Sequence, residues 1–175
     1  RHRDPSGFEN LSRVGVVLRQ SIGAEHGYHQ VGTAARITGK QSLAGERSIL
    51  MALGERRFEI VEILDDDPYP LAAIRYLTET GGSPEAVPLR DRVVSALRKY
   101  LALSAEGGEG GNILIEVSED PAAASFQVAS LMRLSSPEHQ ELLEAASVEE
   151  RLRRELAVLE QESGLLRRLL NMGRL

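Results

Sequence analysis

The sequence lacks cysteine and tryptophan entirely, and aromatic residues fill only 4% of its 175 positions. Without cysteine the chain cannot form disulfide bonds, thiolate zinc sites or a cysteine nucleophile. This absence fits a reducing compartment, so we expect the protein to be cytoplasmic. A run of about 20 apolar residues is also missing, so we expect no helix that spans a membrane.

An initiator methionine and an excess of positive charge are lacking too. The first residues, Arg1 to Pro5, are polar and unlike a signal peptide. We therefore expect the chain to start inside a longer protein, or after a segment that is removed. The 26 acidic residues outnumber the 21 lysines and arginines, which gives a formal net charge of −5. This balance argues against nucleic acid or an anionic membrane as the partner.

The segment from Gln30 to Leu77 places apolar residues at every second position, and glycines and prolines divide it into pieces of strand length. This pattern predicts a β-meander whose strands each bury one face. We expect strands at Val31–Ser42, Ser48–Leu53, Arg57–Leu64 and Leu71–Leu77, and turns at Ala44–Glu46, Gly54-Glu55 and Asp65–Pro68.

Two shorter segments precede the meander. The run Arg13–Arg19 is rich in β-branched residues, which predicts a strand buried on both faces. The segment Ser21–Gln30 contains two glycines and two histidines, and we interpret it as a hairpin loop.

The apolar period changes from two to 3.6 after the linker Thr78–Val87, which indicates a boundary near residue 85. A first helix is predicted by Leu89, Val93, Leu97 and Leu101, which share one helical face. A second linker, Glu106–Asn112, precedes the apolar run Ile113–Val117, whose structure the pattern leaves open. Further helices are expected to start at Asp120-Pro121, at Ser136-Pro137 and at a capping box formed by Ser147 and Glu150. Helices joined by such short links predict a small bundle.

The last helix carries a narrow apolar seam and many charges. The seam consists of Leu152, Leu156, Leu159, Ser163, Leu166 and Leu170. Arginines at 151, 153, 154, 167 and 168 alternate with glutamates at 149, 150, 155, 160 and 162, which is typical of a solvated helix face.

Two polar segments resemble fragments of metal sites. His26 and His29 have a spacing that can share a metal ion, and Asp65–Asp67 offers oxygen ligands to a hard cation. Neither segment supplies enough further ligands, so we predict a polar loop and a turn. We expect no bound metal and no cofactor.

Other catalytic or nucleotide-binding patterns are incomplete. Gly32–Lys40 ends like a phosphate loop, but its glycines are too far apart and Gln41 stands where a Ser or Thr is required. The Gly107–Gly111 run lacks the preceding strand of a dinucleotide loop, and we interpret it as a flexible linker. A Ser-Lys dyad would have to use Lys40 or Lys99, and Lys99 is expected on an exposed helix face.

Several of these segments, taken in order, resemble the amino-terminal domain of Lon-type ATP-dependent proteases. The resemblance is carried by Arg13–Leu18, Val31–Ile37, Gly54–Ile60, Pro68–Ala72, Ser135–Glu144 and Ser147–Leu152. It implies an α+β fold, a PUA-like β pseudobarrel in residues 1–82 followed by a small helical bundle in residues 83–175. The Pro-rich strand that opens the family's domain is missing. We assign Gly54 to a tight turn and Phe58 to the core.

In that family the domain is non-catalytic and recognises substrates and partners, and the ATPase and Ser-Lys protease modules are absent from this chain. The family's long charged coil does not follow Leu175, so we expect a stand-alone Lon-domain protein in preference to an excised fragment. The resemblance implies binding of unfolded or flexible polypeptides, or of a protease partner, and a weak homo-oligomer is one further expectation. The alternatives are a PUA-like module that binds RNA or a small molecule, and a hydrolase.

The carboxyl end holds more apolar residues than one seam of a terminal helix can bury. Some of them must face solvent, a neighbouring helix or a partner, and exposed apolar patches usually mark interaction sites. The predicted partner contacts are Leu165, Leu166, Leu169, Leu170 and Met172.

Overall fold

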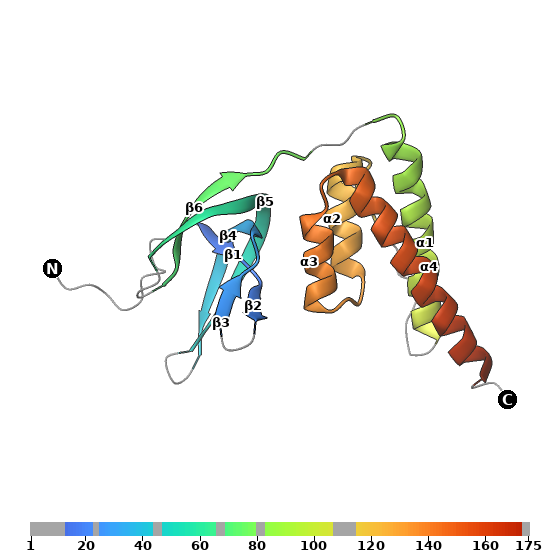
Figure 1. Cartoon of the computed structure of the whole chain (residues 1–175). Helices are drawn as coiled ribbons and strands as arrows, with labels where there is room; N and C mark the ends of the chain where they lie inside the picture. Colours follow the sequence, from blue (N-terminus) through green and yellow to red (C-terminus); the bar gives the residue numbers. More distant parts are fainter. Residues whose placement is uncertain are drawn as a thin grey trace. The chain divides into compact units, whose positions relative to one another are not determined.

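The computed structural model describes residues 13–22, 25–43, 47–65, 69–79, 83–106 and 115–172, and within them six strands are followed by four helices (Figure 1). The α+β class predicted from the sequence is confirmed. The chain divides into two units, Arg1–Thr78 with the strands and Glu79–Leu175 with the helices.

The strand unit contains a four-stranded antiparallel sheet and a separate two-stranded hairpin. The sheet has the order β1-β4-β5-β6, so the three strands of the meander are neighbours as expected. Its strands are β1 (Arg13–Val16), β4 (Val31–Ser42), β5 (Ser48–Asp65) and β6 (Leu71–Tyr76). The hairpin pairs β2 (Arg19–Ile22) with β3 (Glu25–Tyr28).

The turn predicted at Gly54-Glu55 is wrong, because β5 runs through it without a break. Gly54 pairs with Ala35 and Arg56 pairs with Ala34, so Glu55 is an extra residue in a β-bulge. One inserted residue shifts the alternation of side chains by one position. In the sequence this shift looks like the end of one strand and the start of another.

Both predictions for the segments before the meander need correction. Ser21–Gln30 is not a loop, because most of it belongs to the β2–β3 hairpin. The run Arg13–Arg19 is not buried on both faces: β1 ends at Val16, whose side chain is 54% exposed. β1 is the last strand on its side of the sheet, so it has neighbours on one side only.

Several predicted turns and linkers lie outside the described residues. They are Ala44–Glu46, residues 66–68 of the Asp65–Pro68 turn, Gly81-Gly82 in the first linker and Gly107–Gly111 in the second.

Phe58 is the centre of the strand unit's core. Its side chain is 2% exposed and clusters with Ala34 and Ile60. The ring lies against the backbone of Gly32, where a Cβ atom would come within 2.7 Å of both Phe58 Cζ and the Val16 carbonyl oxygen. Only glycine fits this close approach.

Glu55 links two strands through its carboxylate. Arg13 and Arg36 lie opposite each other in the β1–β4 pair, and the Nε of each donates a 2.8 Å hydrogen bond to Glu55. The two arginines hold the pKa of Glu55 below its usual value, chiefly through these hydrogen bonds. Two arginines opposite each other would repel, and the carboxylate of the bulge residue offsets this repulsion by bridging them.

The helical unit begins with one long helix and ends with another. The helices are α1 (Ala86–Glu106), α2 (Pro121–Leu131), α3 (Ser136–Glu144) and α4 (Val148–Met172). Ile115–Val117, the described part of the apolar run before α2, is neither helix nor strand. It is held to α1 by Arg90, whose Nη2 donates to the Val117 carbonyl at 2.9 Å.

Local hydrogen bonds explain where the later helices start. The Asp120 carboxylate accepts the Ala123 N–H at 2.9 Å, as its sequence position predicts. The cap of α3 is Ser135, one residue earlier than predicted, and it forms a capping box with Glu138. At α4 the Ser147 hydroxyl accepts the Glu150 N–H at 3.1 Å.

The core of this unit joins α1 to α4 and α2. Val93 and Leu97 of α1 are fully buried, and Leu89 and Leu101 are half-buried, so the predicted helical face is confirmed. The buried cluster consists of Val93, Leu97, Tyr100, Val128, Met132, Val148, Leu152, Leu156 and Leu159.

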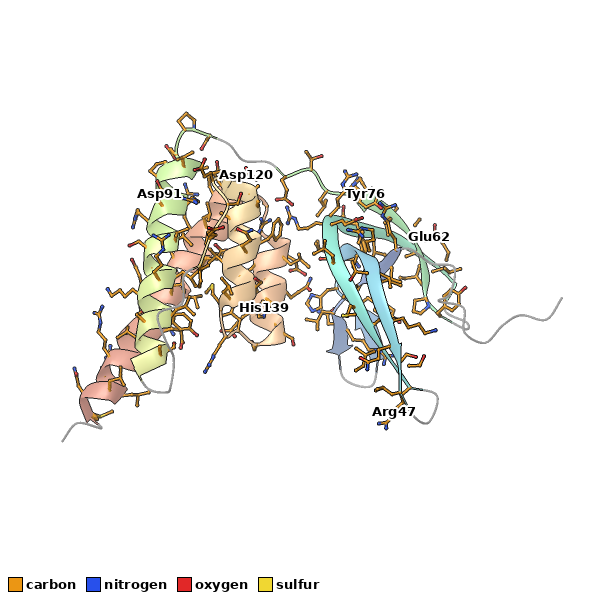
Figure 2. The ribbon with its side chains drawn as sticks, turned by 180° about the vertical axis from the view of Figure 1, so that it is seen from behind. Arg47, Glu62, Tyr76, Asp91, Asp120 and His139 are labelled. Atoms are coloured by element: carbon orange, nitrogen blue, oxygen red, sulfur yellow. The ribbon has the colours of Figure 1, made fainter. Side chains whose placement is uncertain are left out.

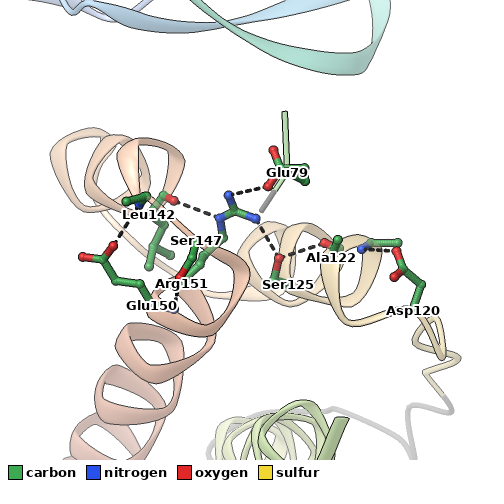
Figure 3. Close-up of polar contacts among 10 residues, drawn as sticks. Glu79, Asp120, Ala122, Ser125, Leu142, Ser147, Glu150 and Arg151 are labelled. Carbon is green, nitrogen blue, oxygen red and sulfur yellow. Dashed lines mark hydrogen bonds and ion pairs between the residues drawn. The ribbon is translucent and has the colours of Figure 1, made fainter. Parts of the chain in front are cut away.

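Arg151 and Glu155 do not lie on a solvated face, contrary to the prediction, because both side chains are completely buried. The Arg151 guanidinium donates to the Leu142 carbonyl at 3.0 Å and to Ser125 Oγ at 2.9 Å (Figure 3). It also forms a 3.1 Å ion pair with Glu79 and stacks over the Phe126 ring. One guanidinium thus ties α4 to α2, to the end of α3 and to the segment before α1.

Glu155 lies one helical turn beyond Arg151, and neither of its carboxylate oxygens has a hydrogen-bond partner. Burial raises the pKa of Glu155 to about 9, although the positive charge of Arg151 acts in the opposite direction. The folded protein therefore holds this carboxyl group protonated at neutral pH.

Replacing Phe58 by alanine should lower the free energy of unfolding by about 3–5 kcal/mol, because it leaves a cavity in a well-packed core. Phe58→Leu, which keeps most of the apolar volume, should cost less. The measurement is urea unfolding followed by circular dichroism. A loss below about 1 kcal/mol for Phe58→Ala would show that the ring is not in the core.

Glu155 should make stability fall as pH rises. The unfolded chain loses this proton near the ordinary value of 4.5, whereas the folded chain keeps it up to about pH 9. Between these values the folded state binds more protons, so the group lowers the unfolding free energy by up to about 1.4 kcal/mol per pH unit.

Glu155→Gln should remove this contribution, so its advantage over the parent should grow between pH 5.5 and pH 8.5 in urea unfolding. The matched control is Glu160→Gln, which changes an exposed acid on the same helix and should keep the parent's slope. Parallel stability curves for the parent and Glu155→Gln would contradict a buried, protonated Glu155.

Candidate functional site

The apolar residues predicted as partner contacts fall into two groups on α4. Leu165, Leu169 and Met172 are exposed, the last two by 60% and 63%. Leu166 and Leu170 are half-buried, and Leu166 packs on the helical core. We call the three exposed side chains the helix patch. They lie four and three positions apart, which places them along one side of the helix.

The helix patch exists because α4 is much longer than two of the helices that accompany it. At 25 residues α4 extends roughly 37 Å, whereas α2 and α3, with 11 and 9 residues, extend roughly 16 Å and 14 Å. Val158, seven residues before Leu165 on the same side of α4, is still half-buried against the core. Beyond Val158 the same apolar side of α4 is no longer covered, and its side chains become exposed.

A second apolar surface lies on the far part of β5. β1 pairs with β4 only as far as Arg36, and β6 pairs with β5 only from Phe58 onward. Among the described residues, Ile37–Ser42 and Ser48–Ala52 therefore form a ribbon of two strands. Arg47, the residue just before its second strand, is labelled in Figure 2.

This ribbon is apolar on both faces, because its second strand contains four apolar residues in succession and Leu53 continues the run. Ile49, Leu50, Met51 and Leu53 are all exposed, Met51 by 57% and Leu53 by 55%. We call these four side chains the apolar ribbon. The sequence predicts a strand here with one face buried, whereas both faces are exposed. The unbroken run Ile49–Leu53 was the signal for a different environment, but it equally fits a strand buried on both faces.

The other end of β5 is apolar and exposed as well. Val61, Ile63 and Leu64 are exposed there, together with Leu71 and Ile74 of β6. Beside them the Arg56 guanidinium lies 4.4 Å from the centre of the Tyr76 ring, which Figure 2 labels. The long strand thus carries exposed apolar side chains on both sides of its buried middle.

Lys99, one of the two lysines considered for a dyad, lines a groove between α1 and α4 together with Ser95 and Ser163. In the described part of the chain no hydrogen bond joins the Lys99 ammonium to either hydroxyl. The second lysine, Lys40, lies in β4, where the Gly32–Lys40 segment is strand and not a phosphate loop.

The metal-site fragments are only partly described. His29 lies between β3 and β4, and no description covers the His26 side chain or Asp66 and Asp67. Among the residues that the structure describes, no three His, Asp or Glu side chains are grouped so that they can hold a metal ion. None of the described helices has the length and the apolar character needed to cross a membrane.

Comparison with known protein families gives one match over most of the chain. Residues 7–161 match the model of the ATP-dependent protease La (LON) substrate-binding domain. The chain belongs to this family. The resemblance recognised in the sequence is therefore confirmed.

Known relatives of this LON substrate-binding domain are Lon proteases. Lon protease 2 of Herpetosiphon aurantiacus is 31% identical over 139 residues, and Lon protease of Azospirillum brasilense is 30% identical over the same length. Each alignment covers 79% of this chain and 17% of the relative. The chain thus spans about one sixth of the length of these enzymes.

Two solved structures share the fold. The N-terminal domain of the Lon protease from Mycobacterium avium complex superposes with a TM-score of 0.57 at 22% identity, covering 86% of this chain and 77% of that domain. A Lon N-terminal domain protein from Xanthomonas campestris gives 0.56 at 21% identity, with coverages of 83% and 75%. These similarities agree with the antiparallel sheet and four helices described above.

Proposed function

We propose that this chain is a non-catalytic recognition module that binds unfolded or flexible polypeptide segments through exposed apolar side chains. The observation that supports this most directly is the apolar ribbon, which leaves four large apolar side chains exposed. Exposed apolar surface of this kind is unfavourable in water unless a partner covers it.

A flexible polypeptide suits these surfaces better than a rigid partner does. The ribbon and the helix patch are narrow, because one strand and one helix side supply them. Each contains a methionine, Met51 and Met172, whose unbranched side chain adapts to differently shaped neighbours. Narrow, adaptable strips can take up apolar residues from many sequences without a fixed register.

The expected affinity is modest. Full burial of one leucine or isoleucine side chain is worth about 1.5–3 kcal/mol, and much of the sum is lost to ordering a flexible ligand. We expect dissociation constants around micromolar, about −8 kcal/mol. Weak binding fits a module that passes polypeptides to a protease, which is the role we propose from the Lon proteases among its relatives.

The test is fluorescence anisotropy with a labelled, permanently unfolded polypeptide. Met51→Thr with Leu53→Thr alters the apolar ribbon and keeps strand propensity, while Leu165→Gln with Leu169→Gln alters the helix patch and keeps helix propensity. Both double variants replace exposed residues, so each should unfold within about 1 kcal/mol of the parent. We expect the ribbon variant to weaken binding at least about fivefold.

The helix-patch variant serves as the matched comparison, because it removes a similar apolar area from the other unit. Loss of binding in that variant alone would move the site to α4. Failure of the parent to bind at about a hundred micromolar would refute the recognition role. Leu166 and Leu170 are unsuitable for this test, since they are half-buried and polar replacements there would also change stability.

We further expect no ATP hydrolysis and no peptide-bond hydrolysis by the purified chain. The Gly39-Lys40 pair belongs to a strand, and Lys99 makes no hydrogen bond to a described serine. The measurement is phosphate release and cleavage of an unfolded substrate, each compared with a blank without protein. Turnover that disappears in Lys40→Ala or Lys99→Ala would overturn this expectation.

A further inference from the structure

A groove of about 440 Å³ runs between α1 and α4. The two helices point in the same direction, because the Ser83 hydroxyl just before α1 donates a 2.8 Å hydrogen bond to Glu149 in the first turn of α4. The groove is lined by α1 from Arg92 to Lys99 and by α4 from Leu156 to Arg167.

The groove is lined by more positive than negative charge. Arg92 and Lys99 project into it from α1 and Arg167 from α4, and Glu160 is the acidic residue of the lining. Within the described part of the chain these three cations form no ion pair and no hydrogen bond. Three other arginines of α4 are paired, Arg151 with Glu79, Arg153 with Glu85 and Arg154 with Glu150. The excess of unpaired positive charge stands out in a chain whose net charge is −5.

The floor of the groove is apolar and its wall is open. Leu156 and Leu159 form the floor, and the nearly buried Ser163 adds a hydroxyl group. Gly164 also lines the groove, and a Cβ atom placed there would find no other atom within 4 Å. Glycine inside a helix is unfavourable, and packing gives no reason for it here. Its effect is to widen the groove.

We propose that this groove binds an extended polypeptide segment in which two acidic side chains flank apolar ones. Arg92 and Lys99 are seven residues apart on α1, about 10 Å along the helix axis. In the extended polyproline II conformation a chain rises about 3.1 Å per residue with three residues per turn, so carboxylates three positions apart point to the same side about 9 Å apart and match this spacing. The residues between them then lie over Leu156 and Leu159.

The spacing of the cations favours such a segment over a phosphate group. A phosphate concentrates its charge at one point and is held by donors that converge on it. Arg92 and Lys99 are instead two helical turns apart, and the apolar floor gives a phosphate no contact. The inference rests on the proposed function for the polypeptide nature of the ligand, but it uses a surface separate from the apolar ribbon and the helix patch.

The test compares two labelled eight-residue peptides, one with two glutamates flanking two leucines and one with glutamines in place of the glutamates. We expect the acidic peptide to bind this chain about tenfold more tightly at low ionic strength, and the difference to shrink when salt is added. Arg92→Gln with Lys99→Gln should abolish the difference.

Gly164→Leu provides a second test that changes no charge, because its side chain fills the groove. It should block the acidic peptide, while Gly164→Ala should leave binding nearly unchanged. Both replacements favour the helix and should raise the melting temperature, so lost binding cannot be attributed to unfolding. Equal binding of the two peptides, or unchanged binding in the charge and Gly164→Leu variants, overturns the proposal.

The unfolded apolar polypeptide used for the proposed function separates the two hypotheses. If it binds the parent and all groove variants alike while the acidic peptide does not bind, the groove proposal is wrong and the proposed function stands. An RNA oligonucleotide or polyphosphate that competes for the groove more strongly than the acidic peptide also overturns it. If the parent binds the acidic peptide but does not bind the apolar polypeptide, the proposed function is wrong and the groove proposal remains supported.

Discussion

The constraint on which the exposed surfaces depend is a mismatch in length within each unit. β4 and β5 have 12 and 18 residues, but the outer strands that pair with them, β1 and β6, have only 4 and 6. α4 has 25 residues, against 11 and 9 in α2 and α3. An element that extends beyond its cover must either become polar there or expose apolar side chains. In this chain both long elements stay apolar, which is why the apolar ribbon and the helix patch exist.

The covered part of α4 is fixed by an unusual means, a buried arginine. Arg151 donates hydrogen bonds to a carbonyl group in α3 and to a hydroxyl group of α2, and both of these groups also have a partner within their own helix region. Removing one partner of such a buried network costs several kcal/mol, so the arrangement is strongly specified. Glu155 remains next to it without any hydrogen bond. The positive charge of Arg151 does not offset its burial, and the group stays protonated at neutral pH.

Local chemistry in the sequence predicted the class of fold and most element boundaries, and the resemblance of several segments in order predicted the family. Asp120 caps α2 as expected, and Phe58 is in the core, since caps and apolar periods act over a few residues. The errors have tertiary causes. Glu55 shifts the alternation of side chains in the strand as a turn would. Arg151 belongs to a series of alternating arginines and glutamates, which is typical of a solvated helix face. Exposure of the helix patch follows from the length of other helices, which a pattern within α4 cannot show.

The two sides of α4 present different surfaces, one apolar and one with positive charge. Leu165 and Leu169 lie on one side and Arg167, in the groove, lies on another, because residues two apart on a helix differ by about 200° in direction. A chain of net charge −5 does not attract acidic segments from a distance. At physiological salt the groove's cations act only within about 8 Å. If the proposed functions hold, non-directional apolar contact governs the first encounter, and the groove selects among segments only after they have reached the helix.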